Sequence, residues 1–156
     1  MIKVTQFADP SGTETTAQLR VCLPFDERKK SRLRTTAETG EPLGLMLPRG
    51  HILRDGTRLL DETGRVILVQ AASETVSTVT SADPHQVLRA AYHLGNRHVP
   101  LQIGAGWLRY QHDHVLDAMV AGLGLTVTVE QAPFEPEDGA YAGGHAHSHG
   151  GGHHEH

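Results

Sequence analysis

The first half of the chain is made of short runs in which apolar and polar residues alternate. Residues 19–23 and 43–47 carry leucine or valine at every second position, and residues 66–69 form a continuous apolar run. Patterns of this kind are typical of β-strands with one or both faces buried. Between them, Thr-Gly and Asp-Gly pairs supply residues that tolerate the backbone of tight turns. We therefore expect an all-β domain over residues 1–73.

In the second half of the chain the apolar period lengthens and helices enter the pattern. Asp83 is a suitable N-cap, Pro84 favours the first helical position, and Gln86 stands where a capping box needs it. This pattern predicts a helix over residues 84–94, and the Gly-Asn pair that follows favours a left-handed helix end. Its expected apolar face is Val87, Leu88, Ala91 and Tyr92.

Strand patterns surround a second helix. Residues 99–103 and 107–111 are joined by Gly-Ala-Gly, which favours a hairpin, and Asp113 is the expected N-cap of the next helix. The apolar face expected for that helix is Val115, Leu116, Met119, Val120 and Leu123. With strands at 76–81 and 125–130, the order is β-α-β-β-α-β, that of a ferredoxin-like fold. We assign this fold to residues 74–136, and the chain as a whole to the α+β class.

Histidine is concentrated at the C-terminus. Of the 12 histidines in 156 residues, six fall in the last 12 positions, namely His145, His147, His149, His153, His154 and His156. Residues 137–156 hold few apolar groups, so that burial could not offset the entropy of ordering them. We expect a flexible, disordered tail whose imidazoles bind metal ions weakly. A purification tag is the alternative, although a tag is usually an unbroken histidine run.

Charge and composition disfavour several classes of protein. The net charge is -4, and four of the 18 acidic residues lie beyond residue 134, which leaves the rest of the chain balanced against 14 Lys and Arg. A neutral body disfavours nucleic-acid binding, which depends on clustered cations. Short apolar runs and a polar N-terminus disfavour membrane insertion and secretion. Cys22 is the one cysteine and cannot form an internal disulfide, which fits a cytoplasmic protein.

One cationic segment interrupts this balanced body. Five cations lie within seven residues, namely Arg28, Lys29, Lys30, Arg32 and Arg34. The simpler interpretation is a solvated strand edge, on which charges discourage aggregation. The alternative is a docking surface for an acidic partner.

Three histidines within the folded body are candidate metal ligands. His98 lies at a helix-to-strand junction, where a twofold axis could bring two copies together, although a lone surface histidine fits the sequence equally well. His112 and His114 flank Asp113 where a strand ends and a helix begins. Chelation by this pair competes with simple capping of the helix by Asp113.

No catalytic motif accompanies these histidines. The sequence holds no phosphate loop, no Gly-x-Ser-x-Gly and no His-Glu-x-x-His, and Cys22 has no sequence neighbour that would activate its thiol. We therefore expect a protein that is not an enzyme. A metal-dependent hydrolase whose ligands are dispersed along the chain is the enzymatic alternative.

Several segments together resemble the UreE family of urease accessory proteins. They are Arg28-Lys-Lys-Ser-Arg-Leu-Arg34, Leu47-Pro-Arg-Gly50, Leu53-Arg-Asp-Gly56, Tyr92-His-Leu-Gly-Asn-Arg-His-Val-Pro-Leu-Gln102, His112-Asp-His-Val-Leu-Asp117 and the histidine-rich end. The match covers essentially the whole chain in the right order. The resemblance implies a cytoplasmic, homodimeric nickel metallochaperone, with a β-rich N-terminal domain that contacts partners and a ferredoxin-like domain that binds metal.

The resemblance also implies partners and ligands. Ni²⁺ would pass through the GTPase of the maturation set to the urease apoprotein accessory complex. His98 matches the family histidine that both protomers contribute to a shared site, whereas His112 and His114 match a pair that offers additional sites, sometimes filled by Cu²⁺ or Zn²⁺. The tail matches a feature that varies across the family.

Transfer by ligand exchange is the mechanism that these features predict. Imidazole binds metal as the neutral base, so affinity should fall as the pH drops through about 6.5, and a site with few protein ligands can be opened by a partner that offers better ones. Nickel itself rests on the resemblance, because copper binds more tightly at nearly any nitrogen site. The alternative function is passive storage of nickel or zinc by the tail.

Overall fold

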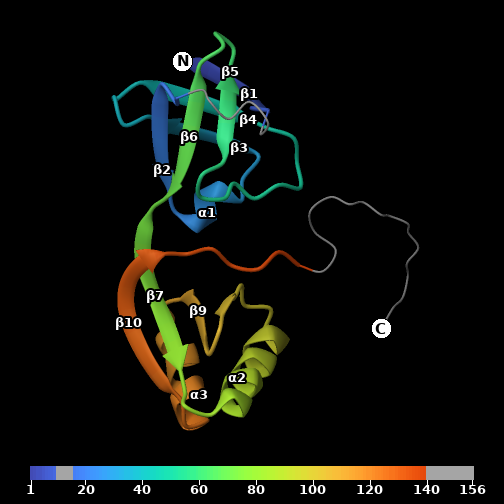
Figure 1. The fold of residues 1–156 in the computed structure, drawn as a ribbon, viewed down its shortest axis with the longest axis vertical. Helices are drawn as coiled ribbons and strands as arrows, with labels where there is room; N and C mark the ends of the chain where they lie inside the picture. The colour runs from blue at the N-terminus through green and yellow to red at the C-terminus, as the bar shows by residue number, and fades with distance from the viewer. Residues whose placement is uncertain (10–15, 140–156) are drawn as a thin grey trace, which may run out of the picture. The chain divides into compact units, whose positions relative to one another are not determined.

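The structure, a computed structural model, describes residues 1–9 and 16–139 (Figure 1). It divides into two compact units, one built from Met1–Gln70 and the other from Ala71–Glu137. This division lies three residues before the 73/74 boundary that the change of apolar period suggests. Among the described residues no helix is both long enough and apolar enough to span a membrane.

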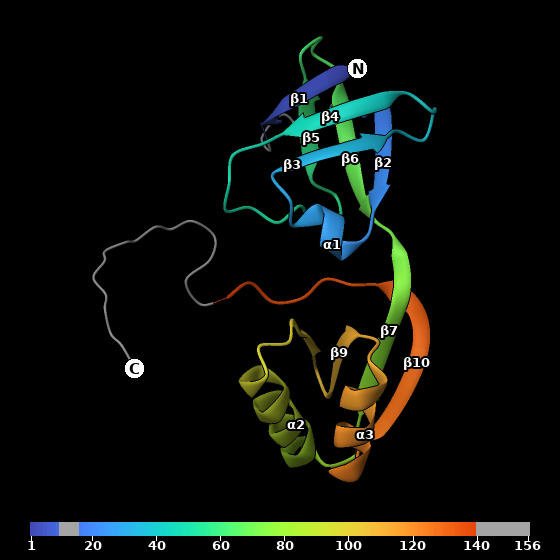
Figure 2. The ribbon, with the colours of Figure 1, turned by 180° about the vertical axis from the view of Figure 1, so that it is seen from behind.

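The first unit is mostly strand. In chain order its elements are β1 (Ile2–Phe7), β2 (Leu19–Leu23), α1 (Phe25–Arg28), β3 (Arg32–Thr36), β4 (Pro42–Met46), β5 (Arg58–Asp61) and β6 (Val66–Ala71). The strands form one sheet in the order β2-β6-β5-β1-β4-β3, in which β1 and β4 run parallel (Figures 1 and 2). The alternation predicted for residues 19–23 is confirmed, because the leucines and the valine are buried while Arg20 and Cys22 are exposed.

The prediction of an all-β first domain is wrong in one element, because α1 is a helix of four residues. A helix this short shows no apolar period, so the sequence pattern could not reveal it. The strand β1 also gave no signal, since Val4 is the one fully buried residue among its six. β1 is recognised only from its pairing within the sheet, and α1 only from its backbone.

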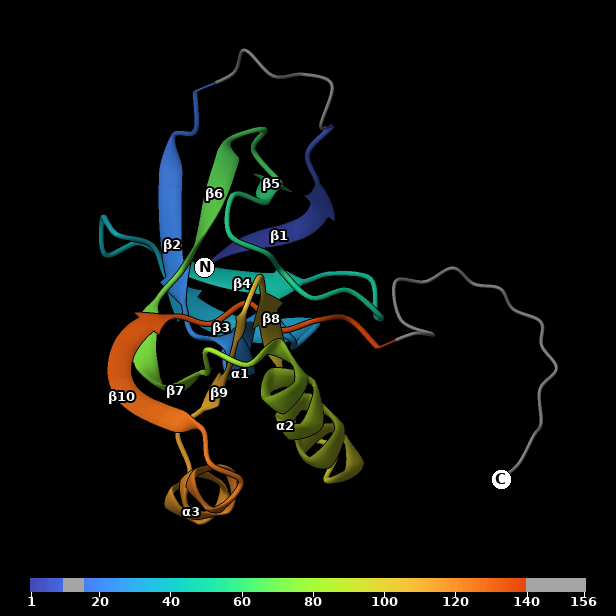
Figure 3. The same ribbon diagram turned by 60° about the horizontal axis from the view of Figure 1, so that its bottom comes forward.

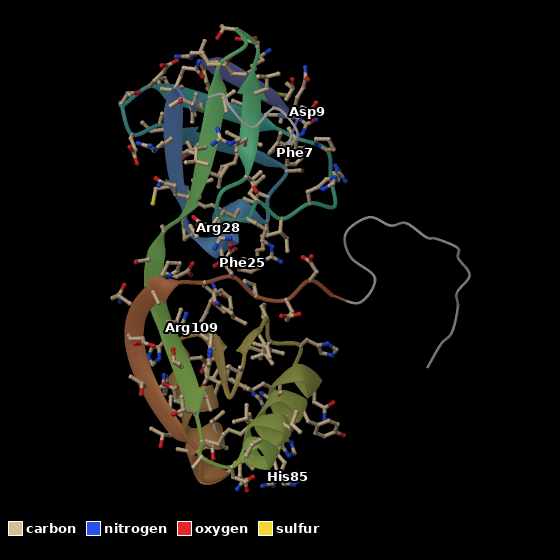
Figure 4. All side chains as sticks on the ribbon, in the orientation of Figure 1. Phe7, Asp9, Phe25, Arg28, His85 and Arg109 are labelled. Atoms are coloured by element: carbon tan, nitrogen blue, oxygen red, sulfur yellow. The ribbon has the colours of Figure 1, made fainter. Side chains whose placement is uncertain are left out.

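Arg28 is withdrawn from the cationic segment into the interior. Its side chain is fully buried, with Nε donating to the Leu23 carbonyl and Nη1 donating to the Leu53 carbonyl, both at 3.0 Å. Figure 4 shows it beside Phe25, with the guanidinium carbon 5.8 Å from the ring centroid. The prediction that Arg28 belongs to a partner-binding surface is therefore wrong, because this cation is buried and joins α1 to the segment between β4 and β5.

The second unit has the predicted element order. Its elements are β7 (Ser73–Thr80), α2 (Pro84–Asn96), β8 (Gln102–Gly104), β9 (Trp107–Gln111), α3 (His114–Gly122) and β10 (Thr126–Pro133). Neighbouring strands all run antiparallel in the order β10-β7-β9-β8. Both helices cover the same face of the sheet (Figure 3), because Leu94 of α2 and Val120 of α3 share one core with Leu108 of β9.

The start of α2 combines a confirmed prediction with a wrong one. The Asp83 carboxylate accepts from the His85 amide at 2.9 Å, as an N-cap should. The capping box is wrong, because Gln86 donates instead to the Leu123 carbonyl at 3.2 Å and Ser81 Oγ accepts from the Asp83 amide at 3.1 Å. The amide of Gln86 thus connects the start of one helix to the end of the other.

The apolar faces of both helices are narrower than their sequences suggest. Leu88 and Tyr92 are 69% and 66% exposed, and Val115 of α3 is 57% exposed. Each was expected in the core. Each helix buries only the residues that face the sheet directly. Apolar residues at the margin of that face remain exposed to solvent.

The sheet face away from the helices carries a polar network. Arg109, labelled in Figure 4, donates from Nε to Thr78 Oγ1 at 2.9 Å, and the Thr78 hydroxyl donates to the Glu130 carboxylate at 2.5 Å. The Arg109 guanidinium also lies 4.8 Å from the Trp107 ring centroid. This face is therefore covered by polar and aromatic side chains rather than by helices.

Candidate metal site

His98 occupies a left-handed backbone conformation at the end of α2. Its φ is 60°, and it is the one non-glycine residue with positive φ in the described part of the chain. The prediction that Gly95 and Asn96 end the helix in this way is wrong, because both are helical and His98 takes the position instead. Strained backbone at a residue other than glycine is characteristic of functional positions. Here it coincides with a candidate metal ligand.

His112 lies between the end of β9 and the start of α3. Its main-chain amide donates to the Thr75 carbonyl at 3.1 Å, which fixes the backbone beside β7. The next residue, Asp113, caps α3 by accepting from the amides of Val115 at 2.8 Å and Leu116 at 3.2 Å. Hydrogen bonds from Leu116 and Val115 hold the pKa of Asp113 below its ordinary value. The capping interpretation of Asp113 therefore matches the geometry.

The side chains of His98 and His112 line one surface hollow of about 350 Å³, which we call the histidine hollow. Its other lining residues are Val99, Pro100, Gln111, Asp113 and Leu116. Both histidines are exposed to solvent. His114, the first residue of α3, does not line this hollow. The structure therefore places His112 and His98 on the lining of one hollow and leaves His114 outside that lining.

Within residues 1–9 and 16–139, one copy of the chain gathers no group of three His, Cys, Asp or Glu side chains suited to hold a metal ion. The histidine hollow offers two imidazoles, which are good ligands for nickel, copper and zinc. The six tail histidines, His145, His147, His149, His153, His154 and His156, lie outside the described residues.

Asp117 contacts the ring of His112 and had no assigned role in the sequence. Its Oδ2 lies 3.0 Å from His112 Nδ1, while its Oδ1 accepts a hydrogen bond from the Tyr110 hydroxyl at 2.6 Å. Ser77 Oγ lies 3.2 Å from the same Nδ1. Ser77 and Tyr110 are buried and face each other across β7 and β9. The sequence signal that could have identified Asp117 is its position in the first turn of α3, where a carboxylate can reach back past the cap.

Burial determines the protonation of the Tyr110 hydroxyl. Burial, followed by the hydrogen bond to the Asp117 carboxylate, raises the pKa of Tyr110 far above its ordinary value. The phenol therefore stays neutral and donates a hydrogen bond to Asp117 at every physiological pH. The carboxylate is consequently held on one side by the phenol, and its second oxygen faces the imidazole.

The exposed members of the cationic segment belong to the first unit, whereas the histidine hollow belongs to the second. Lys29 pairs with Asp26 at 3.3 Å, and Lys30 is exposed beside it. Arg32 and Arg34 lie on β3, which is an edge strand of its sheet (Figure 2). Together with Lys3 they line a second hollow of about 420 Å³. Both sequence interpretations of this segment, a charged strand edge and a docking surface, remain compatible with this placement.

Two family models of known proteins together match nearly the whole chain. Residues 3–72 match the family model of the UreE urease accessory protein N-terminal domain, and residues 74–156 match that of its C-terminal domain. A urease accessory protein UreE of Pseudomonas putida (strain W619) is 61% identical over 142 residues, covering 90% of this chain and 86% of the relative. The UreE of Vibrio parahaemolyticus is 51% identical over 156 residues, covering 96% of this chain and 98% of the relative. The chain therefore belongs to the UreE family of urease accessory proteins.

Proposed function

We propose that this protein is a nickel metallochaperone, which binds Ni²⁺ through histidine side chains and releases it for assembly of the urease active site. Membership in the UreE family implies a role in urease maturation. The observation that carries the proposal is the histidine hollow, where the exposed imidazoles of His98 and His112 line one surface. Nickel is here the cargo of the protein and not a resident cofactor.

A homodimer would complete the ligand set. A twofold axis beside His98 places two imidazoles on one metal ion, and the neighbouring His112 of each copy adds two more. Four imidazoles satisfy a borderline divalent ion, which can take water in its remaining positions. His114 and the tail histidines then serve as additional sites, where Cu²⁺ or Zn²⁺ could also bind.

We also infer that residues 74–136 adopt a ferredoxin-like fold. The inference is supported by the β-α-β-β-α-β order and by antiparallel strands arranged β10-β7-β9-β8, with both helices on one face. In our proposal this domain binds metal and forms the dimer, residues 1–73 contact partners, and residues 137–156 capture metal ions.

The proposed handover is a ligand exchange. Nickel at the histidine hollow is held by few protein ligands and remains open to solvent, so a partner with more or better ligands can replace them stepwise. The partner we propose is the GTPase of urease maturation, which passes the ion to the urease apoprotein accessory complex in the cytoplasm. The side chains of Lys29, Lys30, Arg32 and Arg34 are the proposed contact surface for an acidic partner.

A nickel titration tests the proposal. We would titrate the full-length chain, with its six tail histidines replaced by asparagine, at about pH 7.5, where free imidazole is neutral. We expect about one tightly bound Ni²⁺ per dimer, lost in His98→Ala, and transfer of that ion to the nucleotide-bound GTPase. If the tail replacement alone abolishes nickel binding, passive storage by the tail is the better description, and delivery through the folded domain is wrong.

A further inference from the structure

We propose that Asp117 is the positioning residue of His112, which it fixes in the tautomer that carries its proton on Nδ1. The other ring nitrogen, Nε2, is then left as an unprotonated ligand for metal in the histidine hollow. This inference rests on the proposed function, in which His112 binds nickel. It assigns to Asp117 and Tyr110 a role that the ligand histidines alone do not explain.

The distance between Asp117 and His112 decides the tautomer. Oδ2 of Asp117 lies 3.0 Å from Nδ1, which is hydrogen-bond distance. A carboxylate has only acceptor sites, so a hydrogen bond between these atoms requires a proton on Nδ1. With the proton on Nε2 instead, two lone pairs would face each other at that distance. The neutral imidazole therefore keeps its lone pair on Nε2.

The carboxylate is itself held in place. Tyr110 donates to Oδ1 at 2.6 Å, and the Asp117 amide donates to the Asp113 carbonyl at 2.9 Å within α3. The Asp117 side chain is 17% exposed, compared with 36% for His112. The edge of the ring that carries Nδ1 thus faces a buried, hydrogen-bonded group. The opposite edge carries the free nitrogen.

This arrangement has a consequence for metal binding. A histidine ligand whose second nitrogen donates to a carboxylate has a fixed ring orientation and a more basic ligand nitrogen, and loss of such a partner typically weakens metal binding by about 10- to 100-fold. His114, by contrast, is exposed at the first position of α3. Of the two, His112 therefore has its ring orientation fixed before metal binds. The side chain of His114 would lose conformational entropy on binding.

The tautomer can be read directly in the metal-free protein. We would record long-range ¹H–¹⁵N spectra of the full-length chain at about pH 8, where imidazole is neutral. We expect the Nδ1–H form at His112. In Asp117→Asn the Tyr110 hydroxyl retains the amide oxygen as acceptor, so the amide NH₂ faces Nδ1 and the proton moves to Nε2. A wild-type protein with the proton on Nε2 would overturn the proposal without any variant.

Two variants control for general effects. Glu130→Gln makes the same change from carboxylate to amide on the opposite face of the sheet, and should leave the His112 tautomer unchanged. Tyr110→Phe removes one hydrogen bond of Asp117 while leaving its contact with His112, and should largely preserve the Nδ1–H form. The same tautomer in Asp117→Asn and wild type would contradict the assigned role.

Nickel itself is the probe for the functional consequence. Ni²⁺ is paramagnetic, so its binding broadens the ring signals of each ligand histidine, and the tail signals in the same molecule serve as an internal reference. We expect the His112 signals of Asp117→Asn to require about 10- to 100-fold more Ni²⁺ than those of wild type. Equal requirements would overturn the positioning role but leave delivery intact. If Ni²⁺ broadens the ring signals of His98 but not those of His112 in wild type, His112 is not a ligand and this inference is wrong. The proposed shared site at His98 would be unaffected by that result.

Discussion

Each unit of the protein holds an aspartate in a network of hydrogen bonds, and the two networks differ in where they end. In the first unit, Asp61 accepts from the Thr63 amide and hydroxyl and from the Arg65 amide, at 2.7–2.9 Å, and from Arg65 Nε at 2.9 Å. Arg65 then makes a two-pronged contact with Glu41. Every group in this network is satisfied by another group of the same unit.

The Asp117 network of the second unit ends differently. One carboxylate oxygen is satisfied by the buried Tyr110 hydroxyl, but the other faces the half-exposed ring of His112. A closed network can only stabilise the fold, whereas a network that ends on an exposed imidazole can also determine how that imidazole binds a ligand. The comparison predicts that Asp61 contributes to stability alone, and that Asp117 contributes to both stability and metal binding.

The largest expected effect is that of Asp61→Ala. It removes four hydrogen bonds and leaves donors of Thr63 and Arg65 without their acceptor, so we expect the first unit to lose about 3 kcal/mol of its free energy of unfolding. Circular dichroism during urea unfolding would measure this loss. Trp107 is the one tryptophan of the chain and lies in the second unit, so its fluorescence transition should stay unchanged. Reduced nickel binding at the histidine hollow would contradict the comparison.

Tyr110→Phe should have a smaller effect, in the other unit. It leaves one oxygen of Asp117 without its donor in a buried place, which costs about 1–2 kcal/mol. The urea transition followed by Trp107 fluorescence should shift accordingly. The control is Tyr92→Phe, which removes a hydroxyl that is exposed on α2 and should shift nothing. Equal shifts for the two variants would mean that the phenol–carboxylate bond adds no stability.

Local sequence rules predicted the parts of this molecule that depend on neighbouring residues. The caps at Asp83 and Asp113 are set by side chains that bond the next few amides, and both are confirmed. The alternation of residues 19–23 likewise needs only one buried face. Such features are decided within a few residues of the chain, so the sequence reveals them.

Features that depend on contacts across the fold were missed. The burial of Arg28 depends on carbonyls at residues 23 and 53, and the role of Asp117 depends on Tyr110 reaching it from another element. The left-handed residue at the end of α2 was expected at the Gly-Asn pair, yet it is His98. Propensity favoured the glycine, but the helix continues past it. The deviation falls on a candidate ligand, where local rules most often fail.

Acid should weaken the closed network of Asp61, Arg65 and Glu41. Burial alone would raise the pKa of Asp61, but hydrogen bonds from Thr63 and Arg65 outweigh it, and the pKa lies below its ordinary 3.8. The hydrogen bond from Arg65 likewise lowers the pKa of Glu41 below 4.5. A lowered carboxyl pKa stabilises the fold above the unfolded-state value, and this stability is lost as the pH falls through the folded-state value.

The measurement is the free energy of unfolding between about pH 6 and pH 2. We expect a decline that begins just below the ordinary carboxyl pKa values, and a shallower decline in Asp61→Asn, which has no charge to lose at that position. A wild-type stability that rises as the pH falls through this range would contradict the assignment. Because Asp61 belongs to the first unit and the histidine hollow to the second, its variant should bind nickel at neutral pH as wild type does.

The smallest expected effect on stability has the clearest functional contrast, and it concerns His98. Its backbone has a φ of 60°, which glycine adopts freely and a residue with a Cβ does not. His98→Gly should therefore stabilise the metal-free second unit by about 0.5 kcal/mol, after the extra entropy of glycine in the unfolded chain is counted. Trp107 fluorescence during urea unfolding would measure the shift.

The same substitution should abolish the shared nickel site, because the imidazole is gone. His98→Asn separates the two effects, since asparagine tolerates the left-handed conformation but supplies no imidazole. It should match wild type in stability and His98→Gly in loss of nickel. A His98→Gly protein that is less stable than wild type would show that contacts of the His98 ring stabilise the second unit more than its backbone conformation destabilises it. A His98→Gly protein that is more stable than wild type but no longer binds nickel would show that histidine at position 98 lowers stability and serves metal binding.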